Sequence, residues 1–210
     1  ALGFNRIPLV LETLSDLETP VSIYLKLANR PNTFLLESVI GGERHGRYSY
    51  VGLATSTQIR ASGRMTTVVQ NGHVIERGGT PDPLDFVRAY LARFRAAEIP
   101  DLPRFRGGLV GYFGYDAVRW IEHRLGGGWQ RPDELGCPDL LLLLCDELAV
   151  IDNLTGRLYL IVYADPARPG AYRDAQQRLR ELNGALHLPI HLPPEPRGAL
   201  GVPRSNFTPA

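Results

Sequence analysis

The sequence predicts an α/β protein of the α+β kind, in which a few helices cover a largely antiparallel sheet. Short apolar and β-branched segments separated by turn residues occupy most of the chain, and two of them flank the hairpin pair Asn71-Gly72. Only a few segments repeat their apolar residues with a helical period. With 210 residues, of which 44% are apolar and 21% charged, the chain is long enough to bury a core.

The first predicted elements are a strand at residues 7–14 and a short helix that ends near Ala28. Thr19 has the side chain of an N-cap, and Pro20 suits the first helical position because its missing N–H is not needed there. Turn residues and a proline at positions 29–32 end the helix.

The next segments are strands. We predict them at residues 33–37, 48–54, 57–61, 66–70 and 73–77. The second and third of these should lie in the same sheet after a short break. The last two flank Asn71-Gly72, the preferred pair for a type I′ turn, so this hairpin is the clearest local prediction in the sequence.

A second helix should begin after Asp82, which is a suitable N-cap and precedes a proline. Its apolar residues repeat with a helical period, so we expect the helix to cover one face of the sheet. This stripe comprises Leu84, Val87, Leu91 and Phe94.

Glycines recur every third position among aromatic residues at 107–116, which read Gly-Gly-Leu-Val-Gly-Tyr-Phe-Gly-Tyr-Asp. The spacing is neither that of a dinucleotide-binding loop nor that of a P-loop. Glycines inside a strand mark bends or close backbone approach. We therefore predict a sharply curved core strand, with Asp116 capping a helix over residues 117–122.

The C-terminal part should contain a loop at residues 126–138 and then two apolar strands at 139–152 and 157–163. A fourth helix at 169–182 should bury one face and stop at Asn183-Gly184. The residues of that face are Tyr172, Ala175, Leu179 and Leu182. Beyond this helix, several prolines and the lack of any period predict a linker.

Composition excludes several classes of function. A formal net charge of +1 without a basic cluster argues against nucleic acid as a partner. No apolar run approaches the ~18 residues that cross a membrane, and no signal peptide is visible. Two cysteines, Cys137 and Cys145, cannot form a disulfide framework, so we expect a cytoplasmic protein. The sequence also lacks the common hydrolase, metalloprotease and redox motifs, so no catalytic residue is nominated.

The candidate binding site lies at residues 35–50, where an apolar strand gives way to glycines and charges and then resumes. Glu37 can accept an ammonium or N–H group, and Ser38 can donate to an oxygen. Arg44 or Arg47 can neutralise a carboxylate. A strand end that carries these acidic and basic groups suits a small zwitterionic ligand, which has both an ammonium and a carboxylate group. The alternative is a β-loop-β unit whose basic loop is simply solvated.

These residues carry a resemblance to a known family. Phe34-Leu35-Leu36-Glu37-Ser38, followed by Gly42-Glu43-Arg44-x-Gly46-Arg47-Tyr48-Ser49, resembles the N-terminal region of anthranilate synthase component I. The glycine-rich motif at 107–116 resembles a second signature of that region. Residues 205–208 resemble the beginning of the family's chorismate-binding catalytic domain. The resemblance implies a feedback site for L-tryptophan at Leu36, Glu37, Ser38 and Arg47.

The resemblance also implies the reaction and its partners. The large subunit of the family converts chorismate to anthranilate and pyruvate, with Mg²⁺ and with ammonia from a glutamine amidotransferase subunit. The catalytic groups and metal ligands would belong to a C-terminal chorismate-binding domain, so this region should bind no cofactor. We expect residues 1–187 to form a tryptophan-sensing domain and residues 188–210 to be a linker that leads into the catalytic domain.

Two alternatives remain open. The first is aminodeoxychorismate synthase component I, a related enzyme in which the same region can hold tryptophan without end-product inhibition. The second is a separate amino-acid-binding or scaffolding module with no catalytic partner. The sequence motifs around Leu36-Glu37-Ser38 and Gly42-Glu43-Arg44 favour anthranilate synthase.

Overall fold

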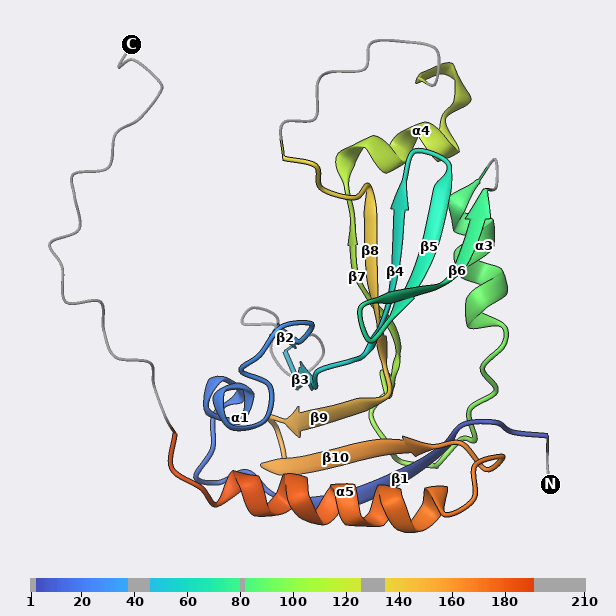
Figure 1. Cartoon of the computed structure of the whole chain (residues 1–210). Coiled ribbons are helices and arrows are strands. Elements are labelled where there is room, and N and C mark those ends of the chain that lie inside the picture. The colour runs from blue at the N-terminus through green and yellow to red at the C-terminus, as the bar shows by residue number, and fades with distance from the viewer. Residues whose placement is uncertain (1–2, 38–45, 80–81, 126–134, 191–210) are drawn as a thin grey trace, which may run out of the picture.

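The computed structural model describes residues 3–37, 46–79, 82–125 and 135–190, and these form two five-stranded antiparallel sheets with four α-helices. The first sheet has the order β1 (Ile7–Leu14), β10 (Arg157–Ala164), β9 (Glu147–Asp152), β3 (Tyr48–Gly52) and β2 (Phe34–Leu36). The second has the order β6 (His73–Gly79), β5 (Met65–Gln70), β4 (Thr57–Ser62), β8 (Leu140–Cys145) and β7 (Gly108–Phe113). The predicted α+β class is confirmed. The described residues are L-shaped, because the second sheet stands upright on one end of the first (Figure 1).

The chain passes from one sheet to the other at two places, and both differ from the prediction. The apolar run predicted as one strand at 139–152 is interrupted at Asp146, which separates β8 from β9. The segments β3 and β4 also lie in different sheets, although we predicted them in one. The two crossings are adjacent, since the Leu53 N–H donates to the Glu147 carbonyl at 3.1 Å. Strand periodicity gives no signal for a change of sheet, because each half keeps its own alternation.

Helices α1 (Pro20–Leu27) and α5 (Ala171–Leu186) cover one face of the first sheet. Thr19 caps α1 as predicted, and its side chain accepts from the Ser22 N–H at 3.1 Å. The core on this side comprises Ile23, Leu27, Val51, Ile151, Leu158, Leu160, Leu179, Leu182 and Leu186 among others. This is the larger of the two helix-covered cores. Because the helices occupy this face of the first sheet, only its opposite face is available for other contacts.

Helix α5 differs from its prediction in two respects. Tyr172 is 64% exposed, and the buried face instead begins at Ala171. The helix also continues through Asn183 and Gly184 to Leu186, whose side chain is buried. Burying a leucine contributes about 1.5–3 kcal/mol, which exceeds the cost of about 1 kcal/mol for a glycine within a helix.

Helices α3 (Pro83–Leu91) and α4 (Val118–Ile121) cover one face of the second sheet. The Asp82 carboxylate accepts from the Leu84 N–H at 2.8 Å, which confirms the predicted cap. Leu84, Val87 and Phe94 pack against this core as expected. Leu91 does not, because it is exposed, and the ring of Tyr90 is buried in its place.

Two predictions based on glycines are confirmed, one of a turn and one of a close backbone approach, and two details of the glycine-rich segment are wrong. Asn71 and Gly72 have φ angles of 51° and 80°, as a type I′ turn requires. Gly111 lies against the backbone of β8, where a Cβ atom would approach the Leu141 carbonyl oxygen to 1.9 Å. However, β7 is an edge strand and not a core strand, and its second half is exposed. Asp116 lies within a 3₁₀ turn before α4, where it pairs with Arg119 instead of capping the helix.

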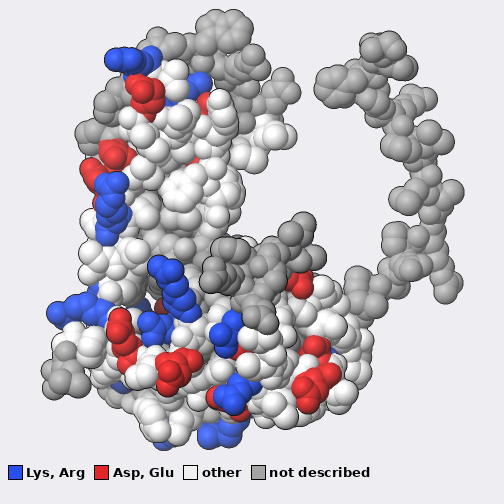
Figure 2. All heavy atoms as spheres, turned by 180° about the vertical axis from the view of Figure 1, so that it is seen from behind, with Lys and Arg blue, Asp and Glu red and all other residues white. Residues whose placement is uncertain are grey.

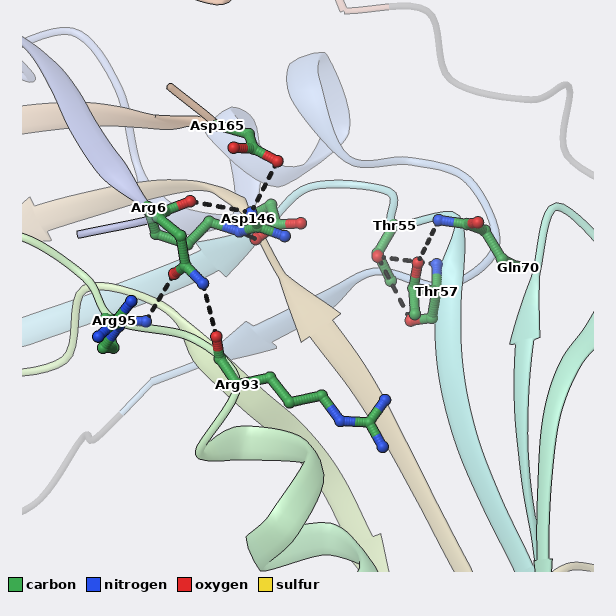
Figure 3. Close-up of polar contacts among 9 residues, drawn as sticks. Arg6, Thr55, Thr57, Gln70, Arg93, Arg95, Asp146 and Asp165 are labelled. Carbon is green, nitrogen blue, oxygen red and sulfur yellow. Dashed lines mark hydrogen bonds and ion pairs between the residues drawn. The ribbon is translucent and has the colours of Figure 1, made fainter. Parts of the chain in front are cut away.

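The N-terminal residues connect the two sheets near the place where the chain passes from one sheet to the other (Figure 3). The Asn5 side chain donates to the Arg93 carbonyl at 2.6 Å and accepts from the Arg95 N–H at 2.7 Å. The Arg6 guanidinium lies 3.7 Å from Asp146 and 3.6 Å from Asp165. Asp146 follows β8 of the second sheet and Asp165 follows β10 of the first, so Arg6 links the two sheets at the corner of the L.

Candidate functional site

One face of the first sheet is not covered by helices, and the residues of the predicted site border it. Leu35 and Val51 point toward α1 and α5, whereas Phe34, Tyr48 and Tyr50 belong to a cluster on the opposite face. Because side chains alternate along a strand, Leu36 shares that opposite face with Phe34. Leu36 is 46% exposed there.

The site has an aromatic floor next to Leu36. Leu36 pairs with Tyr50 across β2 and β3. The rings of Tyr48 and Tyr50 lie 6.2 Å apart, and Tyr50 contacts the ring of Phe105 edge-on at 5.4 Å. Burial raises the pKa of Tyr50, and a hydrogen bond with the Phe105 backbone opposes this shift. Leu36 and these three rings make this part of the sheet aromatic and largely apolar, with the phenol groups of Tyr48 and Tyr50 as its polar atoms.

Glu37 directly follows β2 and is exposed. Ser38 and Arg44 lie outside the described residues. Because β2 and β3 are antiparallel and Leu36 pairs with Tyr50, Glu37 at the end of β2 lies near the start of β3. Glu37 and Arg47 are therefore at the same end of the β2–β3 pair.

Arg47 has a defined partner that the sequence did not reveal. Its Nε atom donates to both oxygens of Asp152 at 3.1 Å, and Nη2 donates to Oδ2 at 2.7 Å. The guanidinium also lies 4.9 Å from the centre of the Tyr48 ring. The Asp152 side chain is 2% exposed and that of Arg47 is 39% exposed. Arg47 is therefore held over the edge of the aromatic floor, and part of its charge is neutralised by Asp152.

The ionised form of Asp152 is stabilised in this position. Burial opposes ionisation, but hydrogen bonds from Arg47, Thr155 and Leu154 outweigh it, so the pKa of Asp152 lies below its ordinary value. The hydrogen bond to Asp152 in turn raises the pKa of Arg47. The pair is thus ionised at neutral pH.

The next residue, Asn153, holds the chain on both sides of Arg47. Its side-chain amide donates to the Gly46 carbonyl at 3.2 Å and to the Ser49 hydroxyl at 3.0 Å. Its backbone N–H donates to the Arg47 carbonyl at 2.7 Å. We predicted the β9–β10 loop from its turn residues but missed its role at the site. The signal available was a buried strand that ends in Asp-Asn, two residues that bond readily to nearby backbone.

Other chemistry finds little support in the described part of the chain. Among those residues, no group of three or more histidine, cysteine or acidic side chains could hold a metal ion. Cys137 is exposed and Cys145 buried, and both are free thiols. Burial raises the pKa of Cys145 to about 12. Acidic and basic side chains are interspersed on the face shown in Figure 2. None of the helices in the described ranges is both long and apolar enough to span a membrane.

Comparisons with known proteins agree with the predicted family. No family model matches the chain. It is 54% identical to anthranilate synthase component 1 of Neisseria meningitidis over 196 residues, which are 92% of this chain and 40% of that protein. It is 51% identical to the Pseudomonas putida protein of that name over 90% of this chain, and 38% identical to the Synechocystis one over 91%. These alignments cover 38% of each relative.

A solved structure, anthranilate synthase component I from Streptococcus pneumoniae TIGR4, has a TM-score of 0.48 and 25% identity and covers 81% of this chain and 36% of its own. The chain belongs to the anthranilate synthase component 1 family and corresponds to its N-terminal region. It spans about two fifths of the length of the curated relatives that it matches.

Proposed function

We propose that this chain is the tryptophan-sensing region of an anthranilate synthase large subunit, which forms anthranilate and pyruvate from chorismate and ammonia. The name and the 54% identity of the Neisseria relative support this proposal over aminodeoxychorismate synthase. So does the arrangement of the site residues, because Arg47 lies over an aromatic sheet face without a helix cover and Glu37 is at the same end of the β2–β3 pair.

We assign the catalytic step to a C-terminal chorismate-binding domain and not to these 210 residues. The described residues offer no cluster of metal ligands, so we place neither Mg²⁺ nor the chemistry on them. In this proposal a C-terminal domain binds chorismate and Mg²⁺, and a glutamine amidotransferase subunit supplies ammonia. Residues 1–187 are then the sensing domain, and 188–210 lead into the catalytic domain. The 210-residue chain alone should be inactive.

Tryptophan fits the chemistry of the site group by group. The Glu37 carboxylate can accept from the ammonium or indole N–H, and the Ser38 hydroxyl can donate to the ligand carboxylate. Arg47 supplies a positive charge at the same edge, held by Asp152. Leu36 with its partner Tyr50 offers an apolar surface for the indole ring. This surface walls the ligand on one side only, so we propose that the catalytic domain provides the opposite wall.

Feedback inhibition follows from that shared pocket. A ligand that contacts both domains binds one of their relative arrangements more tightly and shifts the population toward it. If that arrangement is less active, tryptophan and chorismate oppose each other through linkage. We place the enzyme in the cytoplasm, in keeping with its free cysteines and biosynthetic relatives.

The test uses the full-length enzyme with ammonia as the nitrogen source, which removes the need for the amidotransferase subunit. Ser38→Ala and Glu37→Gln should largely keep turnover and raise the inhibitory concentration of tryptophan several-fold, because each removes a polar contact worth about 1 kcal/mol or more. Glu12→Gln is the matched control, since this carboxylate pairs with Arg157 in a different part of the first sheet. Inhibition curves unchanged in both site variants would contradict the proposed site.

A further inference from the structure

We infer that Asp152 and Asn153 are positioning residues of the tryptophan site, although neither belongs to the segment that carries it. The inference rests on the proposed function, since it concerns how the same site is built. It assigns to the β9–β10 turn the task of fixing Arg47 and the backbone from Gly46 to Ser49 in the geometry that binds tryptophan.

The first observation is the geometry of the pair between Arg47 and Asp152. Three hydrogen bonds of 2.7–3.1 Å join the guanidinium to a carboxylate that is almost completely buried. A bidentate contact of this kind fixes both the position and the plane of the guanidinium. Asp152 is itself fixed by the N–H groups of Leu154 and Thr155, which donate at 3.1 and 3.4 Å. The β9–β10 turn therefore holds the Asp152 carboxylate rigidly, and this carboxylate in turn fixes the long side chain of Arg47.

The second observation is independent of this ion pair. Asn153 bonds to the Gly46 carbonyl, the Arg47 carbonyl and the Ser49 hydroxyl, so its contacts enclose Arg47 from both sides along the chain. The ladder between β3 and β9 ends with the pair Tyr48 and Asp152. The bonds to Gly46 and to the Arg47 carbonyl lie beyond the end of that ladder. These bonds order the residues that precede β3, which the pairing between β3 and β9 does not reach.

The other end of β9 offers a contrast. Glu147, its first residue, receives a bidentate contact from Arg178 of α5, with three hydrogen bonds of 2.9–3.1 Å. The two pairs thus have the same chemistry and similar geometry at opposite ends of one strand. Only the pair at Asp152 reaches the segment next to Glu37. A role in stability alone should leave the tryptophan inhibition curve unchanged when either pair is broken, whereas a positioning role predicts a change only for the pair at Asp152.

The experiment measures ammonia-dependent anthranilate formation by the full-length enzyme at increasing tryptophan, together with kcat and the KM for chorismate. Asp152→Asn and Asn153→Ala should each raise the inhibitory concentration of tryptophan by roughly five- to tenfold, a common size for coupling between sites. Both should keep kcat and KM within about twofold of wild type. Glu147→Gln, the matched control, should leave the inhibition curve unchanged even where it lowers the melting temperature.

A double variant separates positioning from general damage. If Asp152 acts through Arg47, Asp152→Asn should raise the inhibitory concentration no further in an enzyme that already carries Arg47→Gln, because the two residues then act as one unit. Additive effects would overturn this assignment. Should Asp152→Asn fail to fold, Asn153→Ala decides, since the Asn153 side chain is exposed and its loss leaves the core intact.

The outcomes distinguish this inference from the proposed function. A wild-type enzyme that tryptophan does not inhibit would overturn both. An inhibited wild-type enzyme, with Asp152→Asn and Asn153→Ala curves that coincide with it, would overturn the positioning role alone. An equal rise in Glu147→Gln would also overturn it, because the effect would then follow stability and not the site.

Discussion

Replacing Gly111 with alanine tests the structural role of the glycine-rich motif. Gly111 pairs with Leu142 in the middle of the edge pair β7–β8. A Cβ atom at this position would lie 1.9 Å from the Leu141 oxygen and 2.9 Å from the Leu142 Cα. Comfortable contact needs about 3.5 Å, so the strands must separate by roughly 1.5 Å. Both obstructing atoms belong to backbone, which cannot rotate away as a side chain could.

The cost can be worked out from this displacement. Overpacking typically costs about 1–3 kcal/mol, and a separation of this size also breaks neighbouring ladder bonds worth about 1 kcal/mol each. We therefore expect Gly111→Ala to lower the free energy of unfolding by about 3 kcal/mol or more. For a chain of this length that corresponds to a fall in melting temperature of about 6–12 °C.

Thermal and urea unfolding followed by circular dichroism would measure the effect. Gly184→Ala is the matched control, because this glycine lies within α5 and an added Cβ would meet nothing within 4 Å. It should stabilise the protein by up to about 1 kcal/mol, the difference in helix propensity between the two residues. If Gly111→Ala melts at the wild-type temperature, β7 and β8 do not approach as closely as described.

Three further predictions concern charge, thiols and activity. Because the pKa of Asp152 is lowered on folding, its ionised form stabilises the protein above the unfolded pKa, and this contribution is lost as the pH falls through the folded pKa. Urea unfolding should therefore show Asp152→Asn to be less stable than wild type at pH 7, with a smaller difference in the free energy of unfolding near pH 3. An equal difference at both pH values would refute the linkage. Cys137 is exposed, whereas Cys145 is buried with its pKa raised to about 12, so Ellman's reagent at pH 8 should titrate one thiol in the native chain and two after denaturation; rapid reaction of both would mean that β8 opens. The 210-residue chain should form no anthranilate from chorismate, ammonia and Mg²⁺ in a fluorescence assay, and turnover by the pure chain would contradict the division between sensing and catalysis.

The tryptophan site nominated from the sequence stays a prediction. The strand that ends at Leu36 and the residue Arg47 lie at the same end of β2 and β3. Ser38 lies outside the described residues, so its role rests on the family resemblance. Asp152 is 105 residues from Arg47 along the chain, and no local pattern connects the two. The partner of a charged residue is decided by which strands pair, and sequence spacing carries no record of that.

Local physical chemistry was sufficient for the elements whose determinants lie within a few residues. Thr19 and Asp82 cap their helices, and Asn71 and Gly72 adopt the positive φ angles of their turn, because each depends on its own side chain and nearest backbone. The tertiary structure alone decided that the apolar run around Asp146 divides between two sheets. Either half satisfies the same alternation, and only long-range pairing and the burial of each face select the sheet to which it belongs. For the same reason, helix α5 extends past Gly184 to a leucine whose partners lie in the core formed with the first sheet.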